Sequence, residues 1–311
     1  MTVPRILSAG HINWDVTMHV TALPDPDGEV LIEQLVQSGG GSAANVAVAL
    51  VNLGHSAAVY GSVGNDDAGS MALQELDRSG VDTTHVQVHA DKQTSVKYLI
   101  VDAAGDVMVL ANDGANEAFS AQSLGESVFD SIDHLHLTSQ EPAVAAALAE
   151  TAHKYHVTVS FDPGRRVGDR DFSATIAACD ILFLNQHEAA ELDVSSIDAV
   201  SDDHIVVIKR GEDGALIHTP TGEQTHSGFD IEVVDTTGSG DAFAAGFLST
   251  LLTQSSPKAE LPTAVDAYEL PLAVANACGA VTAKKPTARA ELSYTRIESL
   301  LQHKIEEPIG E

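Results

Sequence analysis

The chain has 311 residues, 44% of them hydrophobic, which is long enough to bury a large core. Its 45 acidic residues against 16 basic ones give a net charge of −29, spread along the chain rather than gathered in a tail. This charge argues against nucleic acid or an anionic membrane as a partner and indicates adaptation to a salt-rich cytoplasm. No apolar run approaches the ~20 residues that cross a bilayer, and the N-terminus lacks the apolar core of a signal peptide, so we expect a cytoplasmic protein.

Two kinds of strand pattern occur in the first 120 residues. Residues 5–10 form a largely apolar run, as expected of a buried strand. Other segments alternate apolar and polar side chains around turn residues, and they lie at residues 16–36, 94–101 and 107–110. We predict that these alternating segments form a small β-sheet lid, built from about residues 12–37 and 91–115.

After residue 120 the chain alternates strands with helices. The expected strands are short runs of apolar residues at 134–137, 157–161, 181–184 and 205–208. A helix is expected at residues 142–155. This rhythm predicts an α/β fold, a doubly wound, mostly parallel sheet with helices on both faces. We expect residues 1–311 to form one such domain, with the lid as a part of it.

The most informative segment reads Asp-Thr-Thr-Gly-Ser-Gly-Asp, at residues 235–241. We predict a short β-branched strand before it, at residues 232–234. Residues 242–252 consist of good helix formers with an apolar face, so we predict a helix after it. The segment is therefore expected to form a tight turn between a strand and a helix.

In that turn the backbone N–H groups of Gly238, Ser239 and Gly240 would lie at a helix N-terminus, where anions bind. Asp241 beside such a site has two readings. It is either a carboxylate that caps the helix or a base that takes a proton from an attacking hydroxyl.

Five segments, in the same order along the chain, resemble the motifs of the ribokinase-like (PfkB) carbohydrate and nucleoside kinases. They are Gly39–Ala47 (GGGSAANVA), Gly61–Asp66 (GSVGND), Asn185–Glu188 (NQHE), Lys209–Gly214 (KRGEDG) and Asp235–Phe243 (DTTGSGDAF). Similarity extends from about Ile6 to about Ala283. Residues 159–164 and 182–188 look most like the archaeal branch of nucleoside and sugar-phosphate kinases. The resemblance implies an ATP-dependent kinase with this fold and a β lid.

The resemblance also implies roles for individual residues. Asp241 would deprotonate a primary hydroxyl, and the amides of Gly238, Ser239 and Gly240 would stabilise charge on the transferred phosphoryl group. The residues expected to bind the sugar are Asn13, Asp15, Gly40, Gly41 and Asn45. Many ribokinases carry Lys where this chain has Ser42, which weakens the case for free ribose. Asp235 is either a second acceptor for sugar hydroxyls or, with residues 278–287, part of a site for a monovalent cation such as K⁺.

On the nucleotide side the resemblance implies binding by Asn185, Lys209, Gly211, Gly238, Gly240 and Asn276. Glu188 follows an expected strand and is either a helix cap or a residue that organises Mg²⁺ through water. A Gly-rich loop before a helix also occurs in dinucleotide-binding folds, but the G-x-G-x-x-G spacing is absent. Relatives often pair through their lids, so we expect a homodimer.

Arg165 and Arg166 are two of only 16 basic residues. They follow an expected strand, at the edge where open α/β sheets bind ligands. Arginine suits phosphate or carboxylate, so the pair either binds a substrate anion or bridges to neighbouring acids. We predict phosphorylation of the 5-hydroxyl of a ribofuranose, with ribose 1-phosphate as the leading candidate. The alternatives are a nucleoside, for which Trp14 is a candidate base contact, fructose or another ketohexose, 2-keto-3-deoxygluconate, and a non-catalytic sugar or nucleotide sensor.

Overall fold

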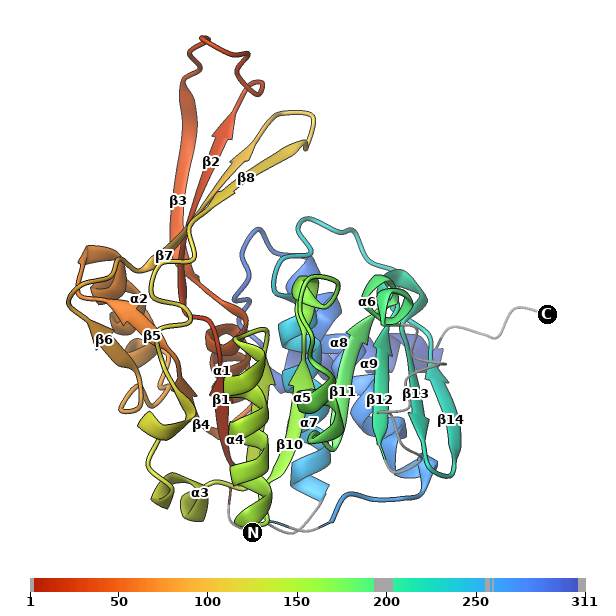
Figure 1. The fold of residues 1–311 in the computed structure, drawn as a ribbon. Helices are drawn as coiled ribbons and strands as arrows, with labels where there is room; N and C mark the ends of the chain where they lie inside the picture. The colour runs from red at the N-terminus through yellow and green to blue at the C-terminus, as the bar shows by residue number, and fades with distance from the viewer. Residues whose placement is uncertain (1–2, 193–203, 255–257, 259, 307–311) are drawn as a thin grey trace.

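The computed structural model describes residues 3–192, 204–254, 258 and 260–306. In this part of the chain the largest element is an eight-stranded sheet, whose strand order is β14-β13-β12-β11-β10-β9-β1-β4 (Figure 1). Neighbouring strands from β4 to β12 are parallel, and β13 and β14 are antiparallel. The strands are β1 (Arg5–Ala9), β4 (Ser56–Tyr60), β9 (His134–Thr138), β10 (Thr158–Asp162), β11 (Ile181–Asn185), β12 (Ile205–Lys209), β13 (Ala215–Thr219) and β14 (Gly222–His226).

Helices cover both faces of this sheet, which confirms the doubly wound expectation. Along β11 alternate side chains enter two separate apolar clusters, with Phe183 in one and Leu182 in the other. The first cluster includes α1 (Ser42–Asn52), α7 (Ser239–Gln254) and α8 (Glu269–Ala283); the second includes α4 (Pro142–Lys154) and α5 (Ser173–Ala177). The remaining helices are α2 (Asp67–Arg78), α3 (Ser127–Ser131), α6 (Gln186–Glu191) and α9 (Tyr294–Glu306).

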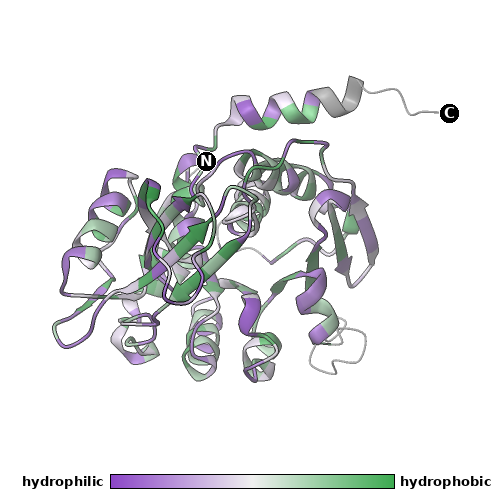
Figure 2. Ribbon diagram, turned by 90° about the horizontal axis from the view of Figure 1, so that it is seen from above, coloured by the Kyte–Doolittle hydropathy of each residue, from purple (hydrophilic) through white to green (hydrophobic). Residues whose placement is uncertain are grey.

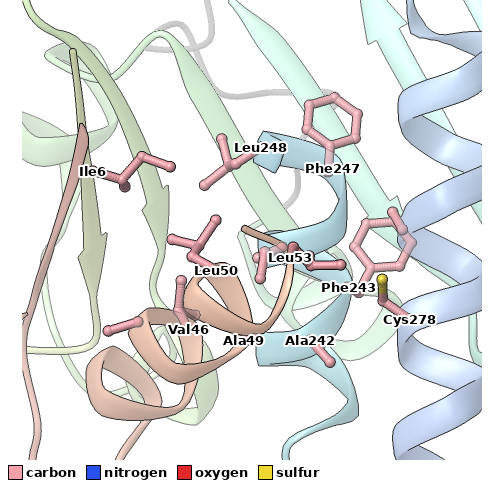
Figure 3. Packing of buried hydrophobic residues seen from close by; sticks show 14 of the residues in the cluster. Ile6, Val46, Ala49, Leu50, Leu53, Ala242, Phe243, Phe247, Leu248 and Cys278 are labelled. Carbon is pink, nitrogen blue, oxygen red and sulfur yellow. The ribbon is translucent and has the colours of Figure 1, made fainter. Parts of the chain in front are cut away.

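Helix α7 is anchored by aromatic packing against the sheet. Figure 3 shows two of its aromatic side chains, Phe243 and Phe247, in the apolar cluster to which α1 also contributes. The Phe247 ring packs edge-on against Phe183 of β11, with ring centroids 5.4 Å apart, and Phe243 lies one turn earlier. Leu50 of α1 is buried in the same cluster. Such close packing fixes α7 on the sheet, so the start of the helix has a defined place. The residues of the glycine-rich turn are positioned in this way.

A second, four-stranded sheet projects from the body of the molecule (Figure 1), in the order β3-β2-β7-β8. Its strands are β2 (Asn13–Val20), β3 (Ile32–Gly40), β7 (Ser95–Val101) and β8 (Val107–Ala111). Strands β2 and β3 are antiparallel, as are β7 and β8, whereas β2 and β7 run parallel. A separate pair joins β5 (Ser62–Gly64) to β6 (Gln87–His89). Strand β3 ends at Gly40, so this sheet leads directly into the glycine loop before α1.

The strand predicted at residues 232–234 is wrong. Among the described residues this segment pairs with no strand, and Val233 and Val234 are exposed. The backbone N–H groups of Val234 and Asp235 both donate to the carbonyl of Ala283, at 2.8 and 3.1 Å. β-branched residues favour a strand only where a neighbouring strand is present to pair with them. Here the carbonyl of one α8 residue replaces the neighbouring strand.

Apolar residues concentrate in the central strands, while the outer surfaces of the helices carry polar ones (Figure 2). Within the described ranges no helix combines the length and apolar character needed to cross a bilayer. Helix α9 lies beside the body of the domain and follows the segment of residues 284–293. That segment contributes to the site described next.

Candidate active site

Asp241 lies in the first turn of α7, and its Oδ2 accepts a hydrogen bond from Nδ2 of Asn45 at 2.8 Å. Burial raises the pKa of Asp241 to about 6; the Asn45 hydrogen bond opposes this rise, and the charge of Asp162 adds to it. A carboxylate with that pKa is mostly ionised at neutral pH and accepts a proton readily. The raised pKa of Asp241 therefore suits a general base better than a simple helix cap.

The glycine turn before Asp241 has a strained backbone that explains its composition. Gly238 has φ +76°, and a Cβ there would clash with the backbone of Ala288. The N–H of Ser239 donates to the carbonyl of Thr236 at 3.1 Å. In the described part of the chain the amides of Gly238 and Gly240 make no hydrogen bond. Two of the three expected anion-binding amides are thus free, and the third closes the turn.

Two of the residues expected to bind sugar, Asn13 and Asp15, lie at the start of strand β2. The Asn13 Oδ1 is already committed, because it accepts from Nδ2 of Asn116 at 2.7 Å. The Asp15 Oδ1 is buried and, among the described residues, has no hydrogen-bond partner. Such an oxygen needs a donor, and a sugar hydroxyl is one. Gly40 faces this carboxylate, and any Cβ at position 40 would overlap it.

Two other predicted sugar-binding residues are placed differently from the expectation. Gly41 has φ +91° and lies against the carbonyl of His11, which makes its role conformational. Asn45 is buried, and both ends of its amide are bonded within the protein: Nδ2 to Asp241, and Oδ1 to Nε of Arg289 at 3.0 Å. In this structure Asn45 therefore bridges protein groups instead of presenting its amide to hydroxyls. Sequence motifs gave no signal for Arg289.

Asp235 lies at the far end of the glycine turn from Asp241. Its Oδ1 accepts from the N–H of Thr237 at 2.8 Å, and its own N–H donates to Ala283. Within the described residues no bond joins Asp235 to Asn13 or Asp15. These contacts favour the alternative in which Asp235 shapes the loop beside residues 278–287 over direct sugar binding.

The two arginines after β10 have different surroundings. Arg166 forms ion pairs with Asp113 at 2.6 Å and with Glu117 at 3.3 Å, whereas Arg165 is exposed and has no ion pair among the described residues. The expected bridge to neighbouring acids therefore exists for one arginine only. Lys97, which sequence reasoning missed, pairs in register with Asp15 across β2 and β7. Its charge opposes the rise that burial causes in the pKa of Asp15.

A cavity of about 730 Å³ borders the start of α7. The predicted nucleotide-binding residues Asn185, Lys209, Gly211, Gly240 and Asn276 line it, and Gly238 does not. Part of its wall is apolar and comes from residues that the motifs did not single out: Phe229, Ile231, Val233, Ala280 and Ala283. Its size and mixed lining suit a nucleotide, with an apolar wall for a base and polar groups for phosphates.

Lys209 links this cavity to the end of β10. Its Nζ forms an ion pair with Asp162 at 2.5 Å. Burial alone would lower the pKa of Lys209, but the charges of Asp162 and Glu188 outweigh burial and the pKa is raised. This ammonium lies close to Gly240, since its Nζ would be 3.4 Å from a Cβ at that position. A fixed positive charge therefore borders the glycine turn.

Glu188 and Asn185 form a capping box at the start of α6. Each side chain accepts the backbone N–H of the other residue, at 2.8 Å in both directions. Burial and then the charge of Asp162 raise the pKa of Glu188. The described residues contain no cluster of three or more His, Cys, Asp or Glu side chains arranged around a metal. One or two carboxylates near phosphates fit Mg²⁺, which keeps most of its water and binds substrate phosphate.

The fold agrees with the comparison of the sequence with known proteins. The model of the pfkB family of carbohydrate kinases matches residues 3–294, and the chain belongs to this family. It is 49% identical over 305 residues to the ATP-dependent ribose-1-phosphate kinase of Halopiger xanaduensis, covering 97% of this chain and 99% of that protein. It is 27% identical to the nucleoside kinase of Methanothermobacter thermautotrophicus, over 79% of this chain and 82% of that one.

Solved structures show the same fold. The ribokinase of Giardia lamblia superposes with a TM-score of 0.86 at 19% identity, over 97% of this chain and all of that one. The ribokinase of Arabidopsis thaliana, in complex with ribose and ATP, gives a TM-score of 0.82 at 21% identity, over 97% and 99% of the two chains. The ribokinase-like fold expected from the motifs is thereby confirmed.

Proposed function

We propose that this kinase transfers the γ-phosphoryl group of ATP to the 5-hydroxyl of ribose 1-phosphate. Two observations together carry the proposal: Asp241 is a buried carboxylate with a raised pKa, and Oδ1 of Asp15, at the root of the lid, is buried without a hydrogen-bond partner among the described residues. The two carboxylates suit different parts of one sugar. The relative from Halopiger, named for this activity, supports the choice of substrate.

The residues divide the reaction between them. The 5-hydroxyl oxygen attacks the γ-phosphorus as its proton passes to Asp241, and the bond to the β,γ-bridging oxygen breaks to release ADP. The free amides of Gly238 and Gly240 and the ammonium of Lys209 border the position where negative charge develops. Asp15 and Asn13 hold the ribose hydroxyls. Arg165 and Lys97, neither with an ion pair in the described chain, are the cations proposed for the 1-phosphate.

Glu188 is the residue proposed to organise Mg²⁺, through water, beside the nucleotide phosphates. The ion would supply charge neutralisation at those phosphates when bound. Asn185 lines the same cavity and keeps the Glu188 backbone in place through the capping box. A K⁺ site beside Asp235 and residues 278–287 is proposed as a secondary feature, because Asp235 is bonded to that segment.

A homodimer through the lid is also proposed. Eight of the large apolar residues that are exposed belong to the lid segments: Leu31, Ile32, Leu35, Tyr98, Val107, Met108, Val109 and Leu110. Soluble monomers rarely leave so many apolar residues together on one exposed element. A second copy of the lid would cover them.

The substrate is tested by ADP formation in 2 M KCl with Mg²⁺, for ribose 1-phosphate, ribose 5-phosphate, ribose, adenosine, cytidine and fructose. Ribose 1-phosphate should give the highest kcat/KM, and ³¹P NMR should show a second phosphate ester on its C5 oxygen. Ribose 5-phosphate carries the same charge with the 5-hydroxyl blocked, so it should give no turnover. A preference for a nucleoside or for fructose would disprove the substrate assignment and leave the kinase class standing.

The anion site is tested in the same assay with Arg165→Ala and Lys97→Met. Loss of one charged hydrogen bond, worth roughly 1.5–3 kcal/mol, should raise the KM for ribose 1-phosphate by at least about tenfold for the residue that is engaged. Arg165→Ala should change the activity on uncharged ribose little, whereas Lys97→Met also removes a charge beside Asp15, so its KM for ribose 1-phosphate is compared with its KM for ribose. If neither variant raises the KM, the 1-phosphate is not bound by these two cations.

A further inference from the structure

Arg289 lies between the two glycine-rich segments of the site, although it is far from both in sequence. Its Nε donates to Oδ1 of Asn45 at 3.0 Å, its Nη1 pairs with Glu75 at 2.7 Å, and its Nη2 donates to the carbonyl of Gly40 at 3.1 Å. The Asn45 amide in turn donates to Asp241 at 2.8 Å. A continuous chain of hydrogen bonds therefore runs from Glu75 through Arg289 and Asn45 to Asp241.

The surroundings of Arg289 leave it little freedom. Its side chain is 7% exposed, and the carboxylates of Glu75, Asp15 and Asp241 all lie near its charge. The second carboxylate oxygen of Glu75 accepts the N–H of Gly39 at 2.8 Å, which ties the ion pair to the glycine loop. A buried guanidinium with partners on all three nitrogens keeps one orientation, because losing any of these bonds would leave a buried charge unsatisfied.

This orientation determines how the Asn45 amide is placed. A guanidinium has only donors, so the Asn45 atom that faces Nε must be the carbonyl oxygen. The amide nitrogen then necessarily faces Asp241, where it donates to the carboxylate. With the amide rotated by half a turn, an oxygen would face the Asp241 carboxylate and repel it. Arg289 is the neighbour that makes this rotated state unfavourable.

We propose that Arg289 is a positioning residue for the base: it locks the Asn45 amide in the orientation that holds Asp241 ionised and in one rotamer. The inference rests on the proposed role of Asp241 as the base. It gives residues 284–293, which carry no recognised motif, a part in the reaction. The hydrogen bonds of Arg289 go to protein groups, those of Asn45, Glu75 and Gly40.

The groups around Asp241 determine how the loss of Arg289 would change the pKa of Asp241. Burial and Asp162 raise the pKa of Asp241, while Asn45 and Lys209 lower it, and the nearby positive charge of Arg289 also favours the ionised carboxylate. Without Arg289 the Asn45 donor is no longer held, so its lowering effect weakens. The pKa of Asp241 should then rise above about 6, and the acidic limb of the pH–rate profile should move to higher pH.

The test is the pH dependence of kcat/KM, from pH 5 to 9 in 2 M KCl, for wild type, Arg289→Met, Asn45→Ala and the double variant. Wild type should show an acidic limb near pH 6. Arg289→Met should move that limb up by roughly 0.5–1 pH unit, the equivalent of one neutral hydrogen bond. In the Asn45→Ala background the limb should already have moved, and adding Arg289→Met should move it by less than the same substitution does in wild type, because only the direct effect of the Arg289 charge remains.

Arg296→Met is the matched control, because Arg296 is exposed and, among the described residues, forms its ion pair with Glu291 near the same end of the chain. It should leave the profile unchanged. If Arg289→Met does not fold, Arg289→Lys keeps the charge without the fork of donors and should give a smaller shift in the same direction.

A lower melting temperature with an unmoved acidic limb would reduce Arg289 to a structural residue and overturn the inference. A full further shift in the Asn45→Ala background would also overturn it, because Arg289 would then act without Asn45. A wild-type profile with no limb near pH 6 would instead remove Asp241 as the base, and the inference with it.

Discussion

At the scale of single residues, Asp241 is subject to opposing requirements. Burial raises its pKa from an ordinary 3.8 to about 6, so the folded protein binds its proton more tightly than the unfolded chain does. The ionised carboxylate therefore destabilises the fold, and this cost grows as the pH rises from about 4 to above 6. The same burial makes the carboxylate a better proton acceptor. Burial of Asp241 therefore lowers the stability of the fold and raises the basicity of its carboxylate.

Replacing Asp241 with Asn should separate the two effects. Turnover should fall roughly 10²–10⁴-fold, the usual span for a general base. At pH 8 the variant should melt at a higher temperature than wild type, because it removes a buried charge, and the difference should shrink at pH 5. Assays and thermal melts in 2 M KCl measure both. Asp266→Asn, at an exposed position, is the control and should change neither. Turnover close to wild type would remove Asp241 from the mechanism.

Sequence reasoning selected candidate residues within short motifs and missed residues that join distant segments. Asp241 and Asp15 were identified because each lies in a pattern of fixed local spacing. Arg289 contacts Asn45 across 244 positions and Glu75 across 214, and no local pattern reports such a contact. Lys97 was a weak signal, a charge in the middle of an apolar strand. Predicting it required the parallel pairing of β2 and β7, which depends on the tertiary fold.

At the scale of elements, apolar runs predicted strands β1, β9, β10, β11 and β12 and helix α4 to within a residue, whereas β13 and β14 were not predicted and α7 begins three residues before its expected start. The expected strand at residues 181–184 is Ile181–Asn185, and the expected helix at 142–155 is Pro142–Lys154. Residues 232–234 were misassigned because the same β-branched pattern occurs where no partner strand is available. Pairing is a property of the sheet and cannot be read from one segment.

The exposed apolar residues of the lid predict a homodimer, whose mass can be measured. Leu35 and Val109 are about half exposed, and an aspartate at either position would place a charge inside the proposed dimer interface. Light scattering in 2 M KCl should give wild type twice the chain mass of 32.5 kDa, and Leu35→Asp or Val109→Asp the single mass. Leu270→Asp adds the same charge at an exposed site on α8, outside the lid, and should stay dimeric. A monomeric wild type would refute the dimer.

At the scale of the whole molecule, the net charge of −29 makes self-repulsion a term in stability. The screening length falls from about 10 Å at 0.1 M salt to about 3 Å at 1 M. Stability should therefore rise with KCl, and a gain of about 2 kcal/mol would raise Tm by roughly 3 °C for a chain of this length. Thermal melts between 0.1 and 2 M KCl measure this, with an uncharged osmolyte as the control for exclusion effects. A flat or falling Tm would show that repulsion is not limiting.

The place where the lid joins the body has a mechanical consequence. Asn13 and Asp15 are at the start of β2, and Gly40 is at the end of β3, so the proposed sugar contacts lie at the root of the projecting sheet (Figure 1), and its exposed apolar residues lie farther out. If the sheet turns about its attachment to the body, the proposed sugar contacts lie close to the axis of that rotation. A swing of its far end would displace these contacts only slightly. Such a swing would open a path for substrate and product while the groups proposed to recognise the sugar keep their arrangement between turnovers.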